Sequence, residues 1–404
     1  MRVPFPAART TAQGSFIPTD PLLKLKKQAL FLSPMPLIVY SHSQTNKPGE
    51  FIWISNRIIG DNPCSFRTVR KEATVTADQP QTDYLKRIQR LCSLGFDLLT
   101  YVLVRILVSF IQTLPADMGD KLCHRLAWIT TVLLKIRHDI TEQNLKQVFP
   151  NATEADRRRL AYAMWHHLLL MVCEIAWAQR RLHLTNWTKH IVFRENRRTL
   201  RHLLSRRPKV TATGHFGNFE IGGYLTGLMG FNTLTIARKL DNRFVHHWVE
   251  RFRGAKGQHM VDKDGCGPMV DAHLKGGGTL TLLADQHAGP KGCWVSFLGV
   301  PASCHKALAL FSLSAGATMM IGSTTRIQGR PMQFKMACTG IADPDDDPEG
   351  NCESITTLTH WYNDQLSAAI SESVEQYWWL HRRWRTPPPR VAARLAKAEQ
   401  LKAA

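Results

Sequence analysis

The stretch from Val210 to Glu220, Val-Thr-Ala-Thr-Gly-His-Phe-Gly-Asn-Phe-Glu, constrains the fold of this chain more than any other. It predicts a short strand, a turn and the start of a helix. His215 and Glu220 are five residues apart, and on a continuous helix they would lie roughly 140° apart. They can meet if His215 lies in the turn, where Gly214 and Gly217 supply backbone freedom. An imidazole held by a carboxylate can take a proton from a hydroxyl, so His215 is predicted as a general base and Glu220 as its partner.

From residue 209 onward, short strand-like runs alternate with segments of helical periodicity. The predicted strands cover residues 209–213, 233–237, 279–284, 317–323 and 333–337. The predicted helices cover residues 218–229, 242–253, 269–274, 307–315 and 354–371. Strands that alternate with helices are typical of parallel sheets covered by helices. The sequence therefore predicts an α/β fold, with a mostly parallel sheet flanked by helices, over residues 206–390.

Four polar side chains directly follow predicted strands. His215 comes after the first strand, Arg238 after the second, and Asp285 and Gln286 after the third. In open parallel sheets, ligands bind at the carboxyl ends of the strands. We therefore expect these four side chains to meet in one active site.

A helical, membrane-associating region is predicted over residues 84–205. A basic segment, residues 84–90, leads into an apolar run over residues 91–114 that is long enough to span a bilayer. Asp97 and Arg105 argue against a simple span, because a charge at the bilayer centre costs roughly 2.5–3.5 kcal/mol. We therefore expect the run to lie in or dip into the membrane face, with the basic segment on lipid phosphates. A buried helix of a soluble domain is the alternative.

Residues 117–205 have apolar positions at helical spacing and are predicted to be helical. His166 and His167, which are adjacent in this region, are interpreted as residues at the edge of the core rather than as metal ligands. The sequence predicts no metal site.

The chain has 404 residues, with 52 Lys and Arg against 32 Asp and Glu, which gives a formal net charge of +20. Such an excess indicates an anionic partner: nucleic acid, an acidic membrane surface or an acidic carrier. The sequence contains no zinc-finger spacing and no RNA-binding signature, so we expect no nucleic-acid partner. The nine cysteines form no C-x-x-C pair, which indicates reduced thiols rather than a disulfide framework.

The two ends of the chain differ from its centre in composition. Residues 1–83 are rich in Pro, Ser, Thr and Asn and are predicted to be a poorly ordered extension. A start codon assigned too early would also produce such a segment. Residues 391–404 are predicted to form a basic, weakly helical tail.

Several sequence blocks follow one another in a specific order between residues 85 and 388. They are Asn144–Pro150, Glu174, Gly214–Glu220, Arg238, Arg251–Gly254, Leu274–Gly278, Asp285-Gln286, Val295–Pro301 and Glu375–Trp384. In this order the blocks resemble those of the bacterial lipid A biosynthesis lauroyl/myristoyl acyltransferases, within the larger glycerolipid acyltransferase superfamily.

The resemblance implies a glycerolipid acyltransferase-like fold and an O-acyltransferase at the cytoplasmic face of the inner membrane. Such an enzyme moves a fatty acyl chain from acyl carrier protein, or from coenzyme A, to a hydroxyl of a lipid A-type glycolipid precursor, without a further cofactor. His215 would be the general base, and Glu220 would hold its tautomer.

The resemblance also implies which residues bind substrate. Guanidinium groups suit the phosphates of a sugar or of the carrier's phosphopantetheine, and Asp285 is expected to orient a cation or a helix end. The expected substrate-binding residues are Arg238, Arg251, Arg253, Asn218, Asp285 and Gln286.

Two alternatives stay open at this point. The acceptor could be another lysolipid or glycolipid, or the chain could be a non-catalytic, lipid-binding membrane protein. The intact His-x4-Glu block favours an enzyme, because a scaffold has no need of such a pair. Acyl chain length, the identity of the donor and the oligomeric state are not determined by the sequence.

Overall fold

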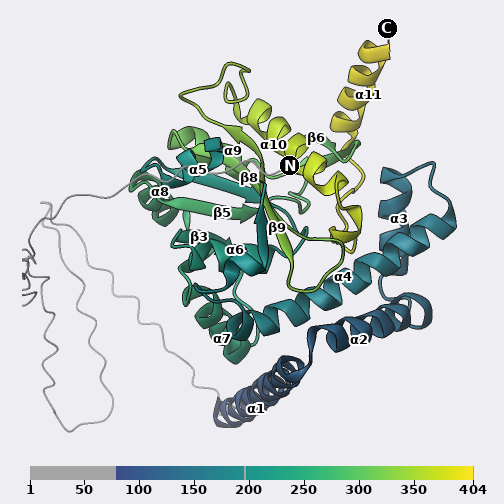
Figure 1. Ribbon diagram of the computed structural model, residues 1–404, viewed down its shortest axis with the longest axis vertical. Helices are drawn as coiled ribbons and strands as arrows, with labels where there is room; N and C mark the ends of the chain where they lie inside the picture. Colours follow the sequence, from purple (N-terminus) through teal and green to yellow (C-terminus); the bar gives the residue numbers. More distant parts are fainter. Residues whose placement is uncertain (1–78, 195–196, 404) are drawn as a thin grey trace, which may run out of the picture. The chain divides into compact units, whose positions relative to one another are not determined.

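The computed structural model describes residues 79–194 and 197–403, so the prediction of a poorly ordered extension over residues 1–83 falls almost entirely outside them. The described chain is an α/β body preceded by long helices (Figure 1). The α-helices are α1 (Gln79–Thr113), α2 (Ala116–Trp128), α3 (His138–Val148), α4 (Glu154–Arg181), α5 (Arg197–Leu204), α6 (Phe219–Leu228), α7 (Arg243–Gly254), α8 (Gly267–Lys275), α9 (Ala307–Ser314), α10 (Ile355–Ser371) and α11 (Pro389–Ala403). A π-helical segment, η2 (Ile129–Leu133), extends α2, and two short 3₁₀ turns are η3 (Trp187–Lys189) and η4 (Val374–Gln376).

A seven-stranded sheet forms the centre of the body, with the strand order β1-β9-β8-β2-β5-β3-β4. Neighbouring strands are parallel except β8 and β9, which are antiparallel, and β6 and β7 form a separate antiparallel hairpin. The strands are β1 (Ile191–Phe193), β2 (Lys209–Thr213), β3 (Thr233–Ala237), β4 (Gln258–Asp262), β5 (Thr279–Leu283), β6 (Cys293–Phe297), β7 (Val300–Cys304), β8 (Thr318–Arg326) and β9 (Phe334–Ala342). The predicted mostly parallel sheet flanked by helices is confirmed.

The two faces of the sheet differ because side chains alternate along each strand. On β2, Val210 and Ala212 are fully buried in a core shared with α9 and α10. Thr211 and Thr213 point to the opposite face, towards α6. Threonines recur on that face in β3 and β5. Thr211 of β2, for example, is the register partner of Thr281 of β5. One face is therefore a packed apolar core, and the other is lined by short, β-branched side chains.

Two strands of the central sheet and the separate β6–β7 hairpin were not predicted. Residues 191–193, within the stretch expected to be helical, form the edge strand β1, because they pair in parallel with β9. Strand β4 and the β6–β7 hairpin were also missed. All of these are edge or peripheral strands, whose pairing depends on distant partners rather than on their own sequence.

Helix α4 is the long core helix of the N-terminal region. Thr153 and Asp156 form a reciprocal capping box at its start, which satisfies backbone donors that the first turn leaves free. Trp177 of α4 is completely buried, and its indole nitrogen donates to the carbonyl of Ile111 at 2.7 Å. Gly119 of α2 lies directly against the same indole ring, where an added Cβ would clash. Helix α4 thus joins α1 and α2 to the α/β body.

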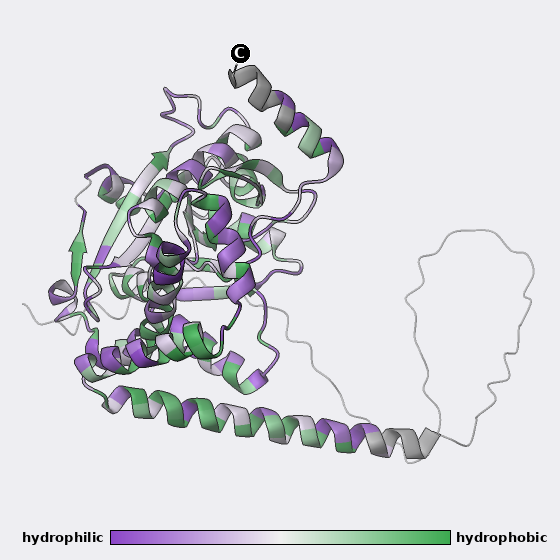
Figure 2. Ribbon diagram, turned by 90° about the vertical axis from the view of Figure 1, so that its right-hand side faces the viewer, coloured by the Kyte–Doolittle hydropathy of each residue, from purple (hydrophilic) through white to green (hydrophobic). Residues whose placement is uncertain are grey.

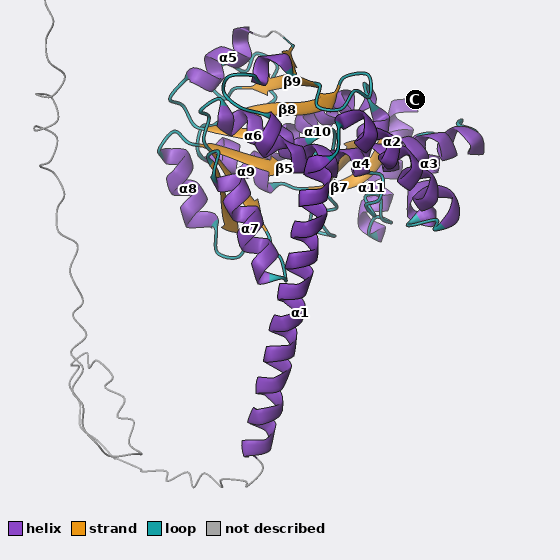
Figure 3. Cartoon of the chain, turned by 60° about the horizontal axis from the view of Figure 1, so that its bottom comes forward, coloured by secondary structure: helices purple, strands orange, loops and turns teal. Residues whose placement is uncertain are grey.

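Helix α1 extends away from the body, as Figure 3 shows. It is anchored where Gln112 donates to the carbonyl of Ala176 at 2.9 Å and where Asn242 of α7 donates to the carbonyl of Asp97 at 2.8 Å. The segment Lys86–Thr113 is long and apolar enough to cross a membrane, with 6% of its most apolar window buried. Figure 2 shows the hydrophobic colouring along this helix. Within the described chain, α1 is therefore not a buried helix.

Helix α4 also has the length and composition of a membrane span, but 44% of its most apolar window is buried inside the protein. Its buried residues include Glu174 and Trp177, which bond to other parts of the body. Helix α4 is therefore a core helix, whereas α1 and the outer side of α2 expose many large apolar side chains.

The exposure of α1 leads to a prediction about membrane binding. Leu103 and Ile106 are 57% and 60% exposed, and burying such a side chain contributes roughly 1.5–3 kcal/mol. We expect Leu103→Gln/Ile106→Gln to reduce binding to anionic liposomes by at least about tenfold in a flotation assay, without lowering the temperature of unfolding.

A matched control substitutes two exposed apolar residues of the α/β body, Met269 and Leu310, which are 58% and 49% exposed. Met269→Gln/Leu310→Gln should float with the liposomes as the unsubstituted protein does. Equal losses from both double variants would show that α1 is not the membrane-binding element.

Candidate functional site

A sharp turn joins the central strand β2 to α6 and carries His215. Gly217 has a φ of +60°, and an added Cβ there would clash with the carbonyl of Thr324 on β8. The backbone N–H of Asn218 donates to that carbonyl at 2.8 Å. Asn218 is the N-cap of α6, and its side chain accepts from the N–H of Ile221. Glycine is required at residue 217 because the turn packs directly on a neighbouring strand.

Asp285 is the carboxylate that binds His215. Its Oδ1 lies 2.8 Å from Nδ1 of His215, and its Oδ2 accepts from the backbone N–H of His215 at 2.8 Å. Asp285 is completely buried. Burial alone would raise the pKa of this carboxyl, but the charge and hydrogen bonds of His215 outweigh burial and lower the pKa. Asp285 is therefore ionised at neutral pH, and its Oδ1 accepts a hydrogen bond from Nδ1 of His215.

The contact between His215 and Asp285 follows from the register of two adjacent strands. Thr213 of β2 is paired with Leu283 of β5, and each functional residue comes two positions later. The predicted meeting of His215 and Asp285 at the carboxyl edge of the sheet is confirmed. Asp285 was expected to orient a cation or a helix end, but its carboxylate bonds to the ring and the backbone of His215.

The predicted contact between Glu220 and His215 is corrected by the structure. Both side chains line the same cavity, but the carboxylate of Glu220 forms a two-pronged ion pair with Arg253 of α7, in which Nε donates to Oε2 at 3.0 Å and Nη2 donates to Oε1. Glu220 lies in the first turn of α6 and faces α7, whereas Asp285 already occupies Nδ1 of His215.

Three rings surround the imidazole of His215. Phe219, Trp378 and His381 have ring centroids 5.2, 5.1 and 4.8 Å from it, each at a steep interplanar angle. The backbone N–H of Trp378 also donates to the carbonyl of His215 at 3.0 Å. Burial, together with the neighbouring His215, lowers the pKa of His381 to about 4. His381 is consequently neutral at pH 7 and adds no positive charge beside His215.

A buried ionic network supports the turn from behind. Arg326, at the end of β8, donates from Nε to Oε1 of Glu174 at 2.8 Å and from Nη2 to Oε2 at 2.7 Å. Glu174 also accepts from the side chain of Asn218 at 2.8 Å. His167 lies 2.8 Å from Nη1 of Arg326 and 3.3 Å from the carbonyl of Gly217. The side chains of Glu174 and Arg326 are 0% and 2% exposed.

This network corrects the prediction for Asn218. The residue was expected to bind substrate, but it is completely buried. Its side chain donates to Glu174 and accepts from the backbone N–H of Ile221, which caps α6. Arg326 was missed altogether. A signal for it existed: Glu174 stands within an apolar helical segment, and a buried carboxylate requires a buried cationic partner.

A cavity of about 480 Å³ extends from His215 along the threonine-bearing face of the sheet. Its lining residues come from strands β1, β2, β3, β4, β5, β8 and β9, from helices α5, α6 and α7, and from adjoining loops. The residues that line it include Thr211, Thr213, Phe219, Glu220, Gly222, Gly223, Thr233, Thr235, Arg253, Thr281, Met320, Gly322 and Met336. Most of the lining is apolar or presents methyl groups, and the charged side chains in it include Glu220, Arg238 and Arg253. Such a space suits a long apolar group that carries one reactive polar end.

Of the three arginines that were predicted to bind substrate, two line the cavity and one does not. Arg238 and Arg253 line the cavity together with Gln286. Arg238 pairs with Asp241 at 2.9 Å, and both side chains are mostly exposed, at 73% and 91%, so that pair holds the guanidinium only weakly. Arg251 is exposed on α7, contacts His247 at 3.0 Å and does not line the cavity. The structure therefore gives Arg251 no role at this site.

The described residues include one group with the donor atoms and spacing of a metal site, formed by Asp120, His124 and His166. It contains neither His215 nor Asp285, and none of its members lines the cavity.

Comparison with known proteins points in one direction. Residues 93–386 match the family described as bacterial lipid A biosynthesis acyltransferase. The chain is similar to the lipid A biosynthesis lauroyltransferase of Escherichia coli (strain K12), with 25% identity over 303 residues, 73% of this chain and 94% of the relative. It is also similar to the lipid A biosynthesis palmitoleoyltransferase of the same organism, with 25% identity over 297 residues, 72% of this chain and 92% of the relative.

Among solved structures, the chain aligns with the 1-acyl-sn-glycerophosphate (LPA) acyltransferase PlsC from Thermotoga maritima. The identity is 11% and the TM-score 0.33, and the alignment covers 65% of this chain and 99% of PlsC. A superposition at this score adds nothing to the description of the site.

The buried network leads to a prediction about stability. Arg326→Met would leave the carboxylate of Glu174 buried without its cation, and breaking a buried pair in this way costs about 3–5 kcal/mol. We expect this loss in the free energy of unfolding, measured by chemical denaturation in detergent. Arg158→Met, which removes the exposed partner of Glu154, should cost less than about 1 kcal/mol. Equal costs for the two variants would contradict the prediction.

Proposed function

The chain belongs to the bacterial lipid A biosynthesis acyltransferase family, and from this premise we propose that it moves a fatty acyl chain from acyl carrier protein, or from coenzyme A, to a hydroxyl of a lipid A-type glycolipid precursor. It is an acyltransferase, as its family and relatives are. The observation that supports the proposed chemistry most directly is the 2.8 Å contact between Nδ1 of His215 and the buried carboxylate of Asp285.

In the proposed mechanism, His215 acts as the general base. Asp285 accepts a hydrogen bond from the protonated Nδ1 of His215, so the unprotonated Nε2 is free to take the proton of the acceptor hydroxyl. The hydroxyl oxygen then forms a bond to the carbonyl carbon of the thioester donor. As the C–S bond breaks, the electron pair leaves with the sulfur, and the proton held by His215 passes to the departing thiolate. Asp285 stabilises the imidazolium that exists between these two proton transfers.

Glu220 and Arg253 have a different role in this proposal. Their ion pair lines the same cavity as His215, and Arg253 is proposed to supply positive charge for the oxygen of the thioester as it becomes an oxyanion. Glu220 holds the guanidinium in place through two parallel hydrogen bonds. Arg238, at the same cavity, is proposed to bind a phosphate of the acceptor or of the donor's phosphopantetheine.

The cavity is proposed to hold the acyl chain. It begins at His215 and continues between the sheet and α6, so a thioester at His215 would place its hydrocarbon tail along the threonine face. Two glycines, Gly222 and Gly223, let α6 approach the sheet, because a Cβ on either would clash with Thr324 or Gln258. The packing of α6 therefore limits the space available to the tail.

The long apolar helices place the enzyme at a membrane in this proposal. Helix α1 exposes Leu103, Ile106 and Phe110, and the net charge of +20 favours an anionic surface. We propose the cytoplasmic face of the inner membrane, where an acyl carrier protein or coenzyme A donor and a glycolipid acceptor can reach the same cavity.

The proposed function is tested by comparing three carboxylate and histidine variants. His215→Ala should lower kcat for acyl transfer by at least about a hundredfold, as expected when a general base is removed. Asp285→Asn should cause a similar loss and change the pH dependence of kcat, because an amide cannot hold the same tautomer. Glu220→Gln should lower activity without changing the pH dependence, since Glu220 acts on Arg253. The measurement is product formation by mass spectrometry over a range of pH.

This test has two controls: the unfolding temperature of each variant, and a substitution of a histidine that does not line the cavity. His360 is half-exposed on α10, and His360→Ala should retain full activity. All variants should unfold at similar temperatures. Full activity of His215→Ala would end the proposal. A pH profile changed by Glu220→Gln but not by Asp285→Asn would instead restore Glu220 as the orienting group.

The cavity also predicts how acyl-chain preference can be changed. Gly322 of β8 lines the cavity, and an added Cβ would meet only the methyl of Thr211, at 3.4 Å. Gly322→Val should therefore fold and shorten the space for the tail. We expect the ratio of kcat/KM for a palmitoleoyl donor to that for a lauroyl donor to fall by about tenfold or more, since each methylene contributes roughly 1–3 kcal/mol in an apolar pocket.

A matched substitution at Gly276, an exposed residue after α8 where a Cβ meets only ordinary contacts, should leave that ratio unchanged. If Gly322→Val and Gly276→Val give the same ratio as the unsubstituted enzyme, the acyl tail does not lie along this face of the sheet.

A further inference from the structure

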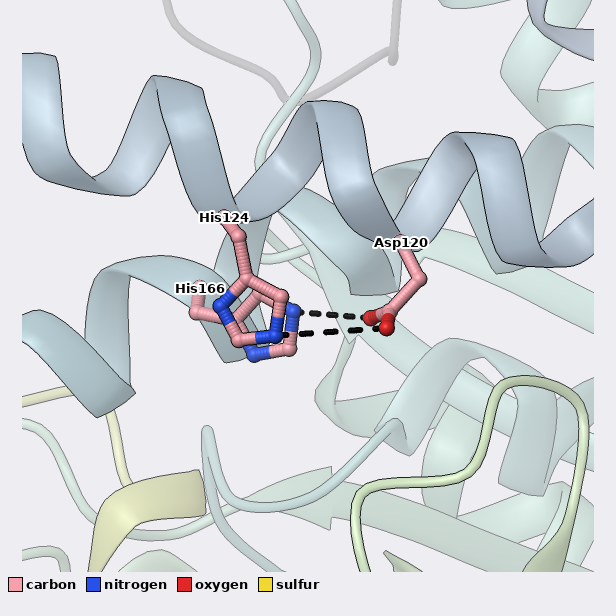
Figure 4. A group of neighbouring side chains, drawn as sticks. All are labelled: Asp120, His124 and His166. Atoms are coloured by element: carbon pink, nitrogen blue, oxygen red, sulfur yellow. Dashed lines mark hydrogen bonds and ion pairs between the residues drawn. The ribbon is translucent and has the colours of Figure 1, made fainter.

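A cluster of one carboxylate and two imidazoles joins α2 to α4. Asp120 and His124 come from α2 and His166 from α4 (Figure 4), and their potential ligand atoms all lie within 4.8 Å of one another. Nε2 of His166 is 2.8 Å from Oδ1 of Asp120, and Nε2 of His124 is 3.9 Å from Oδ2. The two imidazoles are stacked, with ring centroids 3.7 Å apart and planes inclined by 7°.

We propose that Asp120, His124 and His166 form a binding site for a divalent transition metal ion, with Zn²⁺ as the ion that best fits this donor set. Two imidazole nitrogens and one carboxylate oxygen are ligands that zinc accepts in a tetrahedral site. The proposal is independent of the reaction at His215, and it replaces the expectation that the chain has no metal site and that His166 is only a core-edge residue.

The spacing of the ligands supports the proposal. Asp120 and His124 are four residues apart on one helix, so they project from the same side, one turn apart. His166 approaches them from a second helix, which makes the set three-dimensional rather than a chance pair on one surface.

The ligand atoms lie within 4.8 Å of one another, so modest side-chain movements would gather them around one ion. Zinc bonds of about 2.0–2.1 Å in a tetrahedral arrangement place ligand atoms roughly 3.3–3.4 Å apart. The two separations from Asp120, 2.8 and 3.9 Å, lie on either side of this value. The stacked rings would have to open so that both nitrogens point at one ion. The side chain of His124 is 48% exposed, so it has room to rotate.

The surroundings of His124 match those of a metal-binding histidine. Its other ring nitrogen, Nδ1, is 2.9 Å from the hydroxyl of Tyr162. In metal sites, the second nitrogen of a ligating histidine is usually bonded to an outer group that fixes the ring and leaves the first nitrogen for the ion. Tyr162 would have this function, while the exposed side of His124 leaves the remaining coordination position open to water.

A metal ion here would connect two parts of the protein with different tasks. Helix α2 presents apolar residues such as Met118 and Leu122 to the outside. Helix α4 carries His167 and Glu174, which support the turn of His215. A bond through the ion would hold α2 against α4 in addition to the packing of Gly119 on Trp177. An ion with three protein ligands and one water would thus brace α2 against α4.

The test uses the full-length protein without an affinity tag, in detergent micelles, with Zn²⁺ alone as the probe. Isothermal titration should show one tight site, and the temperature of unfolding should rise with Zn²⁺ concentration. His124→Ala and Asp120→Asn should each weaken the affinity by at least about tenfold and abolish the rise in unfolding temperature. Because His124 is exposed, its variant is expected to fold normally.

The matched control is His360→Ala. His360 also has an aspartate four residues away, Asp364, and both are exposed, but this pair belongs to no group of three ligands among the described residues. Its variant should bind Zn²⁺ like the unsubstituted protein. Co²⁺ in place of Zn²⁺ adds a direct readout, since tetrahedral coordination gives intense visible absorption bands that His166→Ala should abolish. Unchanged Zn²⁺ affinity in His124→Ala and Asp120→Asn, or a cobalt spectrum unaffected by His166→Ala, would overturn the proposal.

Discussion

The ion pair between Glu174 and Arg326 is the interaction on which the geometry of the site depends. Two opposite charges removed from water are tolerated only when all of their hydrogen-bonding capacity is used. Glu174 satisfies this condition by accepting from Arg326, from Asn218 and from the backbone of Met332. These partners belong to β8, to the start of α6 and to the loop before β9, so one carboxylate determines where three segments meet.

The same arrangement explains why the turn can hold an imidazole in one orientation. Its backbone is bonded to Thr324 on one side and to Gln376 on the other, and the ring of His215 is enclosed by aromatic neighbours. A general base must meet its substrate in a fixed geometry, because misplacement by about an ångström is costly to the rate. The apolar cavity and the exposed helix α1 suit the hydrophobic part of the proposed substrates. The buried network holds the turn that carries His215.

The sequence was sufficient to predict the central strands, most helices of the α/β body and the convergence of His215 with Asp285, because these rest on local periodicity and on a general property of parallel sheets. It was insufficient for the partner of His215. A spacing of five residues made Glu220 the obvious carboxylate, but the direction in which a side chain leaves the first turn of a helix depends on what lies opposite, here Arg253. The buried status of Asn218 and the role of Arg326 could not be predicted for a similar reason, since both depend on Glu174, which lies far away in the sequence.

The pairing of β2 with β5 has a consequence for how this protein becomes functional. Because His215 and Asp285 each follow a matched pair, Thr213 and Leu283, by two residues, their alignment is inherited from the ladder of amide hydrogen bonds. A slip of one residue would turn every side chain of the displaced strand to the opposite face. Asp285 would then be separated from His215, and its carboxylate would be buried without a partner. The strand pairing that forms the sheet therefore also brings the imidazole of His215 to the carboxylate of Asp285.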